Sequence, residues 1–270
     1  YLAFLVLWVT FIYLPIAHWV WGIGGWIRNL GALDFAGGLV VHISSGASAF
    51  AAAVVVGKRK GYGLEKMPPH NLPMTLVGFN GGSAIASNAI AVNAFVVTHV
   101  ACAAAALGWM FVEWTHREKP TALGVASGAV SGLVAITPAA GYVGPLSAII
   151  IGIFAGIICY FAVGLKSKLG YDDALDVVGV HGVGGIWGAL ATGLFASKAI
   201  NPSSENGLFM GNGLLFLNQI LSIIPVVVYS FVGTFLLLKI IQIFTNLRVA
   251  KDEEVEGLDL SQHGESGYTF

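Results

Sequence analysis

Two histidines lie in the middle of long uncharged stretches, and each stretch begins with an aspartate. Asp34 precedes His42 in the first stretch, and Asp176 precedes His181 in the second. Ionisable groups are costly at membrane depth, so those that occur there usually have a function. An imidazole gains and loses its proton close to physiological pH and is suited to relaying protons. The pair is therefore predicted to be functional. The alternative is that each histidine is a core residue bonded to neighbouring backbone.

The two aspartates stand where helices are expected to begin. A carboxylate at that position caps free N–H groups and meets the positive end of the helix dipole. We therefore predict that Asp34 and Asp176 are caps, and that Asp34 also favours a nearby cation. The sequence has no His-Glu-x-x-His motif, and Cys102 and Cys159 stand in apolar stretches away from the histidines. No metal, cofactor or enzymatic activity is predicted.

The composition is typical of a membrane protein. Hydrophobic residues make up 56% of the 270 residues and charged residues 10%, whereas soluble domains carry about 25% charged residues. A net charge of −1 argues against a nucleic-acid partner. The sequence opens on Tyr1 inside an apolar run without the basic segment of a signal peptide. We therefore expect a fragment whose earlier helices are absent.

Eight uncharged stretches are candidate membrane helices, so the expected fold class is an all-α polytopic membrane protein. They cover residues 1–22, 35–57, 72–87, 91–112, 121–142, 145–165, 177–197 and 212–238. The third is short against the ~20 residues that a span needs, and the last is expected to continue past Lys239. Glycines spaced four apart predict close helix packing in lipid. They are Gly124, Gly128 and Gly132, then Gly152 and Gly156, and Gly184 and Gly188.

Basic residues gather after every second stretch and predict the orientation. They are Lys58, Arg59, Lys60, Lys66, Arg117, Lys119, Lys166, Lys168, Arg248 and Lys251, whereas the opposite loops carry only Arg28 and Lys198. Positive charge favours the cytoplasmic side. We therefore predict a multi-pass domain in the cell membrane over residues 1–248 and a cytoplasmic C-terminal tail over 249–270. This orientation requires the short third stretch to cross the bilayer.

Both histidines are expected near the middle of the membrane. His42 lies ~12 Å along a helix from Asp34, and His181 lies ~8 Å from Asp176. The two helices run in opposite directions, so the histidines approach the centre of a ~30 Å core from opposite faces. Matched patterns of aspartate and histidine on antiparallel helices predict an inverted pseudo-repeat with a central site.

Six motifs spread from end to end resemble those of ammonium transporters of the Amt/Mep/Rh family. They are Pro-Ile-Ala-His-Trp-Val-Trp (15–21), Gly-Ala-Leu-Asp-Phe-Ala-Gly-Gly (31–38), Pro-His-Asn-Leu-Pro (69–73), Gly-Phe-Asn-Gly-Gly-Ser-Ala (78–84), Asp-Val-Val-Gly-Val-His-Gly (176–182) and Glu-Gly-Leu-Asp-Leu-Ser-Gln-His-Gly-Glu (256–265). The resemblance implies the ammonium-transporter fold in a homotrimer, with a hydrophobic pore in each subunit. Eight of an expected eleven helices would be present. It also implies a PII-type signalling protein as a cytoplasmic partner.

The resemblance assigns roles to residues by position. His42 and His181 match the twin histidines of the pore, and Trp21 and Ser83 match the outer site that recruits ammonium and favour the Amt branch. The remaining matches are one of two stacked phenylalanines below that site (Phe79), the aspartate near it (Asp34), and three pore-lining positions (Tyr13, Val177 and Thr137). One departure is the short segment 73–78, where the family has more residues.

The expected function is ammonium transport for nitrogen metabolism. Ammonium is recruited outside, loses a proton near Phe79 and passes His42 and His181. Potassium has no proton to give, so the proton loss separates the two ions. Two alternatives stay open, namely an ammonium sensor without substantial flux and a channel for neutral small solutes. A channel of the aquaporin type predicts paired Asn-Pro-Ala motifs, which the sequence lacks.

Overall fold

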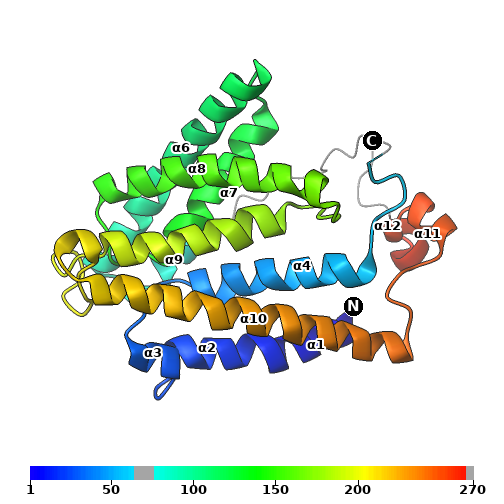
Figure 1. Cartoon of the computed structure of the whole chain (residues 1–270), viewed down its shortest axis with the longest axis horizontal. Coiled ribbons are helices and arrows are strands. Elements are labelled where there is room, and N and C mark those ends of the chain that lie inside the picture. Colours follow the sequence, from blue (N-terminus) through cyan, green and yellow to red (C-terminus); the bar gives the residue numbers. More distant parts are fainter. Residues whose placement is uncertain (64–75, 266–270) are drawn as a thin grey trace.

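The computed structural model is a bundle of long helices that run in alternating directions (Figure 1). It describes residues 1–63 and 76–265, and these contain no strand. The predicted all-helical class is therefore confirmed. Lys66, the motif at 69–73 and residues 73–75 of the segment 73–78 lie outside the described residues.

Three of the six candidate membrane helices in the described residues are composites of consecutive segments. The first consists of α1 (Leu2–Trp8), the π-helical η1 (Val9–Tyr13) and α2 (Leu14–Trp21), and the short α3 (Trp26–Leu30) follows. The second joins the π-helical η2 (Gly38–Ile43) to α4 (Ser44–Val56). After α5 (Leu76–Gly82) come α6 (Ala89–Arg117), α7 (Ala122–Ile136) and α8 (Pro145–Leu169). The π-helical η3 (Val178–Val183) leads into α9 (Gly184–Phe195), and η4 (Leu208–Met210) leads to α10 (Gly213–Phe244). The tail forms α11 (Lys251–Glu256) and α12 (Leu258–His263).

Six helices in the described residues are long and apolar enough to cross a membrane, against eight stretches predicted. The predicted span 72–87 is wrong in extent, because α5 has seven residues and the chain then turns through 83–88. Asn88 ends that turn by capping α6, with its side chain accepting from the N–H of Ala91 at 3.0 Å. The last span does continue past Lys239, to Phe244.

The predicted span 121–142 is also too long, because α7 ends at Ile136. Pro138 has no N–H to donate to the carbonyl of Val134. The N–H of Thr137 donates to this carbonyl instead, at 3.2 Å. The chain then continues as turns through Tyr142. Thr137 therefore lies directly after the last residue of α7 and not within a continuous helix.

Two buried clusters surround the centre of the bundle. One consists mainly of alanines from α6, α7 and α8, and the other combines larger aliphatic side chains of η1, α2, α3, η2, α9 and α10. The predicted glycine packing explains why alanines suffice in the first cluster. A Cβ on Gly128 would lie 2.9 Å from the carbonyl oxygen of Ala105, and one on Gly156 would lie 2.7 Å from the amide nitrogen of Trp109. Small residues therefore let these helix backbones approach closely.

Two glycines bring the helices that bear the histidines into the same kind of contact. A Cβ on Gly46 of α4 would collide with the backbone of Gly182 in η3. A Cβ on Gly185 of α9 would lie 3.0 Å from Ile43 and 3.1 Å from the Cβ of His42. Each glycine stands four residues after one histidine and packs against the residue that follows the other. This reciprocal contact is what an inverted pseudo-repeat predicts.

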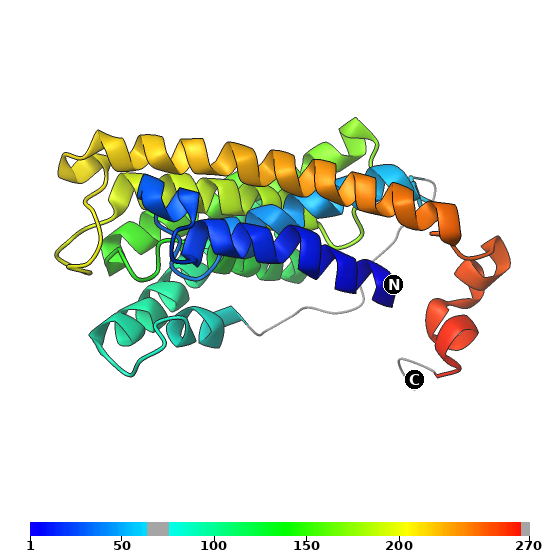
Figure 2. The ribbon, with the colours of Figure 1, turned by 90° about the horizontal axis from the view of Figure 1, so that it is seen from below.

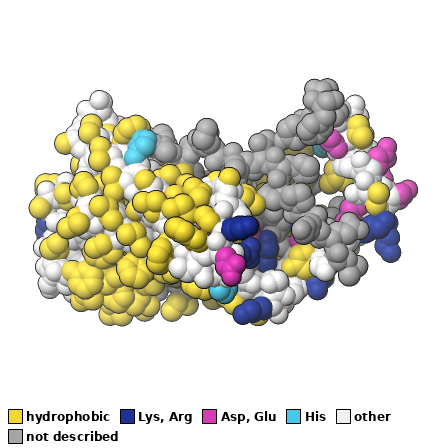
Figure 3. Space-filling view, turned by 90° about the horizontal axis from the view of Figure 1, so that it is seen from above, with side chains coloured by type: hydrophobic (Ala, Val, Ile, Leu, Met, Phe, Trp, Pro, Cys, Tyr) yellow, Lys and Arg dark blue, Asp and Glu magenta, His cyan; other side chains and the backbone are white. Residues whose placement is uncertain are grey.

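Charged side chains gather at one end of the molecule, whereas apolar side chains cover most of the rest of the visible face (Figure 3). The segments that follow α4, α8 and α10 meet at this end, as Figure 1 shows. Arg59 binds Asp172 at 2.7 Å, which joins the segment after α4 to the segment after α8. The helices α11 and α12 lie beyond the end of α10 (Figure 2). The segments after α4, α8 and α10 thus share one end of the molecule, and the predicted orientation in the membrane stays a prediction.

Replacing Gly46 by alanine is expected to force α4 and η3 apart. The added Cβ meets backbone rather than a flexible side chain, so the variant should lose ~1–3 kcal/mol of stability, a usual cost of overpacking. Gly164→Ala in α8 is the matched control, because its Cβ would meet no atom within 4 Å. Thermal unfolding in detergent compares the two variants. Equal midpoints would show that the close approach does not constrain the fold.

Candidate functional site

The two histidines of the broken helices meet in the centre of the bundle. Nδ1 of His42 lies 3.0 Å from Nδ1 of His181, and the ring centroids are 5.2 Å apart with the planes inclined by 34°. His42 is only 2% exposed, and His181 is half-buried. Each stands in a π-helical turn, a local widening that often occurs at functional sites. One imidazole must donate and the other accept in this contact, so the pair shares a proton between them.

A chain of buried polar side chains continues from the pair. Nε2 of His42 lies 3.2 Å from the hydroxyl of Thr137, which in turn donates to Oδ1 of Asn80 at 3.2 Å. The amide of Asn80 donates to the hydroxyl of Thr98 at 3.2 Å. Thr137, Asn80 and Thr98 are each 0% exposed. Thr137 was predicted from the sequence, whereas Asn80 and Thr98 were not. Asn80 was visible as a polar residue within the motif at 78–84, whereas nothing in an apolar helix marks Thr98.

Asp34 organises the turn that begins the helix of His42. Its Oδ1 accepts from the amides of Gly37 and Gly38, and its Oδ2 accepts from those of Leu39 and Val40, at 2.6 to 3.2 Å. These are the free N–H groups of the start of η2, so the predicted cap is present. Both oxygens are engaged, and any attraction for a cation is therefore exerted at a distance rather than by direct contact.

Asp176 does not cap the second helix of the pair, contrary to the prediction. Asp173 does so, with Oδ2 accepting from the amide of Val178 at 2.8 Å. Asp176 forms an ion pair with Lys166 and adopts a left-handed backbone with φ of 56°. The segment before η3 folds back, and this brings the earlier aspartate to the helix end. Val177, the residue before η3, is half-buried.

The residues matched to the outer site lie on two elements. The indole N–H of Trp21, at the end of α2, donates to the carbonyl of Asp34 at 2.8 Å, and the ring is 38% exposed. Ser83 follows α5 and donates its hydroxyl to the carbonyl of Phe79 at 2.8 Å, which leaves the lone pairs of its oxygen to accept. Phe79 is 42% exposed. No hydrogen bond joins Trp21 to Ser83 within the described residues.

Tyr13 lies in the first membrane helix, with its ring centroid 6.2 Å from that of Trp8. Trp8 donates to Ser48 of α4 and Thr234 of α10, both at 3.0 Å. Tyr13 is half-buried and packs against the aliphatic cluster between these helices. The structure therefore assigns Tyr13 a packing contact, and its match to a pore-lining position stays a prediction.

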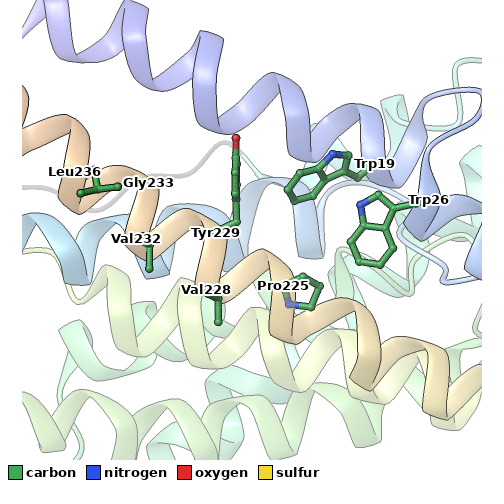
Figure 4. A pocket seen from close by; sticks show the side chains of 8 residues that line it. All are labelled: Trp19, Trp26, Pro225, Val228, Tyr229, Val232, Gly233 and Leu236. Carbon is green, nitrogen blue, oxygen red and sulfur yellow. The ribbon is translucent and has the colours of Figure 1, made fainter.

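A groove of about 420 Å³ lies between α2, α3 and α10 (Figure 4). Trp19, Trp26 and Tyr229 line it together with aliphatic residues of α10. The hydroxyl of Tyr229 donates to the carbonyl of Phe11 at 2.7 Å, and Pro15, four residues after Phe11, has no N–H to donate to that carbonyl. None of the predicted site residues lines this groove, so it is separate from the histidine pair.

Comparison with known proteins gives one consistent result. The model of the Ammonium Transporter Family matches residues 1–268. An ammonium transporter of Bacillus subtilis is 50% identical over 279 residues, which cover 99% of this chain and 68% of that protein. The crystal structure of Saccharomyces cerevisiae Mep2 superposes with a TM-score of 0.85 at 37% identity, covering 92% of this chain and 60% of that one. A solved Sensor Amt Protein has a TM-score of 0.83 at 31% identity, covering 94% and 67%. The chain thus spans 60 to 68% of the length of these three proteins.

Removing the carboxylate of Asp34 is expected to loosen the start of η2. Asp34→Ala leaves four buried amides without their acceptor, at a cost of about 1–3 kcal/mol for each that stays unpaired. Hydrogen exchange should become faster at residues 37–40, and the unfolding temperature in detergent should fall. Asp252→Ala, at an exposed aspartate of α11, is the control. Unchanged exchange at residues 37–40 would contradict the capping role.

Proposed function

Because this chain belongs to the ammonium transporter family, we propose that it conducts ammonium or ammonia across a membrane past His42 and His181. The observation that carries the proposal is the contact of 3.0 Å between two imidazoles at the centre of an apolar helix bundle. Ionisable groups at that depth indicate a path for ions or protons. The family is one of transporters rather than of enzymes, and the six long apolar helices are those of a multi-pass membrane protein.

In this proposal, selectivity arises from dehydration and proton loss. The half-exposed ring of Trp21 attracts a cation through its quadrupole, by up to ~2 kcal/mol when water is excluded. Ser83 accepts a hydrogen bond from an ammonium N–H. Beyond Phe79 the proposed path excludes bulk water, so a bare cation is disfavoured, and ammonium gives up a proton that the imidazole pair relays. Potassium is similar in size and charge but has no proton to release, and the imidazole pair then bonds the neutral ammonia.

The basic end of the bundle is proposed to face the cytoplasm of a cell membrane. Positively charged loops favour that side, and the described segments after α4, α8 and α10 carry them. The tail at 249–270 then lies in the cytoplasm as a regulatory element. The trimer and a PII-type signalling partner are further parts of this proposal, because both follow from membership of the family rather than from a contact within this chain.

The tail reaches the loop after α4 through one carboxylate. Glu254 accepts from the amide of Lys60 at 2.8 Å and pairs with Arg248 at 2.9 Å. The same loop binds Asp172, next to the aspartate that caps η3. These contacts join the tail to the helix of His181 within one chain. Docking of the tail under a neighbouring subunit stays a prediction.

A sensor that binds ammonium without substantial flux is the second candidate. The observation in its favour is the similarity to the solved Sensor Amt Protein. That similarity extends over the same fold, so the fold alone does not separate the two functions. A channel for neutral solutes is the third candidate. Measured flux decides among them.

Replacing either histidine of the pair is expected to leave the protein folded and to change transport. His42→Ala or His181→Ala removes the shared proton, so ammonium flux should fall or potassium should begin to compete. Ammonium-evoked current and potassium flux in proteoliposomes measure both effects. His99→Ala is the matched control, because His99 is an exposed histidine of α6 whose contacts among the described residues are with Phe95 in its own helix.

If wild-type protein carries no ammonium, the sensor becomes the better description. If both variants retain the rate and selectivity of the wild type, the relay role of the pair is refuted.

Acidification is expected to release the tail from the loop after α4. The amide of Lys60, and then Arg248, hold the pKa of Glu254 below its ordinary value of 4.5. The docking contact is therefore complete above pH 4.5 and is lost as pH falls through the lowered pKa, because protonation removes the charge that both partners bind. Hydrogen exchange at the amide of Lys60 reports the release. Glu254→Gln should weaken docking at neutral pH, whereas Glu256→Gln, at an exposed glutamate of the same helix, should not. Docking that does not weaken at any pH below 4.5 would contradict this role.

A further inference from the structure

Five polar side chains from five different elements form one line of hydrogen bonds. The order is His181 of η3, His42 of η2, Thr137 after α7, Asn80 of α5 and Thr98 of α6. All but His181 are buried, with exposures between 0 and 2%. Buried donors and acceptors must be paired, so each hydrogen in this line has a defined place. The hydrogens are assigned in turn from Thr98, at one end of the line, to His181 at the other.

Thr98 fixes the orientation of the Asn80 amide. The single hydroxyl hydrogen of Thr98 goes to the carbonyl of Ala94 at 2.6 Å. The oxygen of Thr98 is then an acceptor, and Nδ2 of Asn80 must be the group that faces it at 3.2 Å. Oδ1 of Asn80 consequently faces Thr137. Without the hydroxyl of Thr98, either end of the amide could face Thr137.

Thr137 in turn fixes which ring nitrogen of His42 carries the proton. The hydroxyl hydrogen of Thr137 has two carbonyl acceptors, Leu133 at 2.7 Å and Oδ1 of Asn80 at 3.2 Å. The oxygen of Thr137 is therefore an acceptor toward His42, and Nε2 of a neutral His42 carries the hydrogen. Its Nδ1 is then bare, so Nδ1 of His181 must donate across the 3.0 Å contact. Nε2 of neutral His181 is left with a lone pair.

We propose that Asn80 and Thr98 are positioning residues that set the order of protons in the histidine pair. When Nε2 of His42 and Nδ1 of His181 carry the protons, Nε2 of His181 has a lone pair that accepts an N–H of ammonia. If the hydroxyl of Thr137 turned toward His42, the protons of His42 and His181 would also move to their other ring nitrogens, and His181 would offer an N–H instead. An N–H cannot accept from ammonia. Asn80 opposes the reversal because it supplies the second acceptor for the hydrogen of Thr137, and Thr98 keeps that acceptor in place.

The first test measures the proton order itself and needs no transport. Nitrogen-15 NMR of histidine-labelled protein in lipid distinguishes protonated from bare ring nitrogens, and the spectrum of His42→Ala assigns the pair. Wild-type protein should show His42 protonated at Nε2 and His181 protonated at Nδ1. Thr98→Val, which removes the hydroxyl at nearly constant shape, should give a mixture of the two orders. Thr98→Ser restores the hydroxyl and should restore the single order.

Asn80→Ala is the second variant, because it removes the link directly. It should give the same mixture as Thr98→Val and keeps the test decisive if the valine variant does not fold. A single order that is unchanged in every folded variant without the hydroxyl or the amide would overturn the inference. A wild-type protein with the reversed order would overturn it as well.

The consequence for transport rests on the proposed function and is measured separately. Loss of one net hydrogen bond corresponds to roughly a fivefold change in an equilibrium, so Thr98→Val should lower the maximal ammonium flux by about that factor and leave half-saturation unchanged. Thr98→Ser should retain the wild-type flux. Absence of flux in wild-type protein together with the predicted NMR result would refute the transport function and support the positioning role. Unchanged flux in a variant whose proton order is mixed would refute the importance of that order for transport.

Discussion

The close approach of two antiparallel backbones is the constraint on which the centre of the molecule depends. Gly46 lies against Gly182, and Gly185 lies against Ile43 and His42. With no Cβ at these positions, the helices come near enough for two imidazole rings, one from each, to share a hydrogen bond of 3.0 Å. Larger residues would separate the rings and leave their nitrogens unpaired in an apolar interior, at a cost comparable to the bond itself.

Broken helices supply the second part of the arrangement. Both histidines stand in π-helical turns, and Thr137 stands where α7 stops before Pro138. Each break exposes backbone groups that need partners within the membrane. The carboxylate of Asp34 accepts hydrogen bonds from the amides at one break. At another break, the hydroxyl of Thr137 donates to the carbonyl of Leu133. Thr137 therefore both satisfies the backbone at its break and contacts His42 of the pair.

Ion pairs and hydrogen bonds at the charged end of the molecule connect the segment before η3 to the tail. Arg59 and Asp172 join two cytoplasmic segments of the proposed orientation, and Glu254 adds the tail to the same loop. Exposed ion pairs of this kind contribute little to stability. These ion pairs instead hold the loops in position, because Asp172 is followed directly by Asp173, which caps η3. A shift of the loop would thus move the start of the helix that carries His181.

The sequence by itself determined the membrane class, the helix-rich fold, the family and the two histidines as candidates, because hydropathy, charge and spacing are local properties of the chain. It also predicted the cap at Asp34, since a carboxylate before an apolar stretch needs no distant partner to act there. The extents of α5 and α7 were missed, because uncharged turns such as 137–142 have the composition of a membrane helix.

Only the tertiary structure decided which aspartate caps the second helix and which polar side chains continue the line from His42. Asp173 caps η3 in place of Asp176, because the segment before η3 folds back and Asp176 forms an ion pair with Lys166. Asn80 and Thr98 join the site across five elements, and such pairings depend on helix packing that no local pattern encodes. A buried polar group is defined by its partner, and the partner is known only when the helices have been placed.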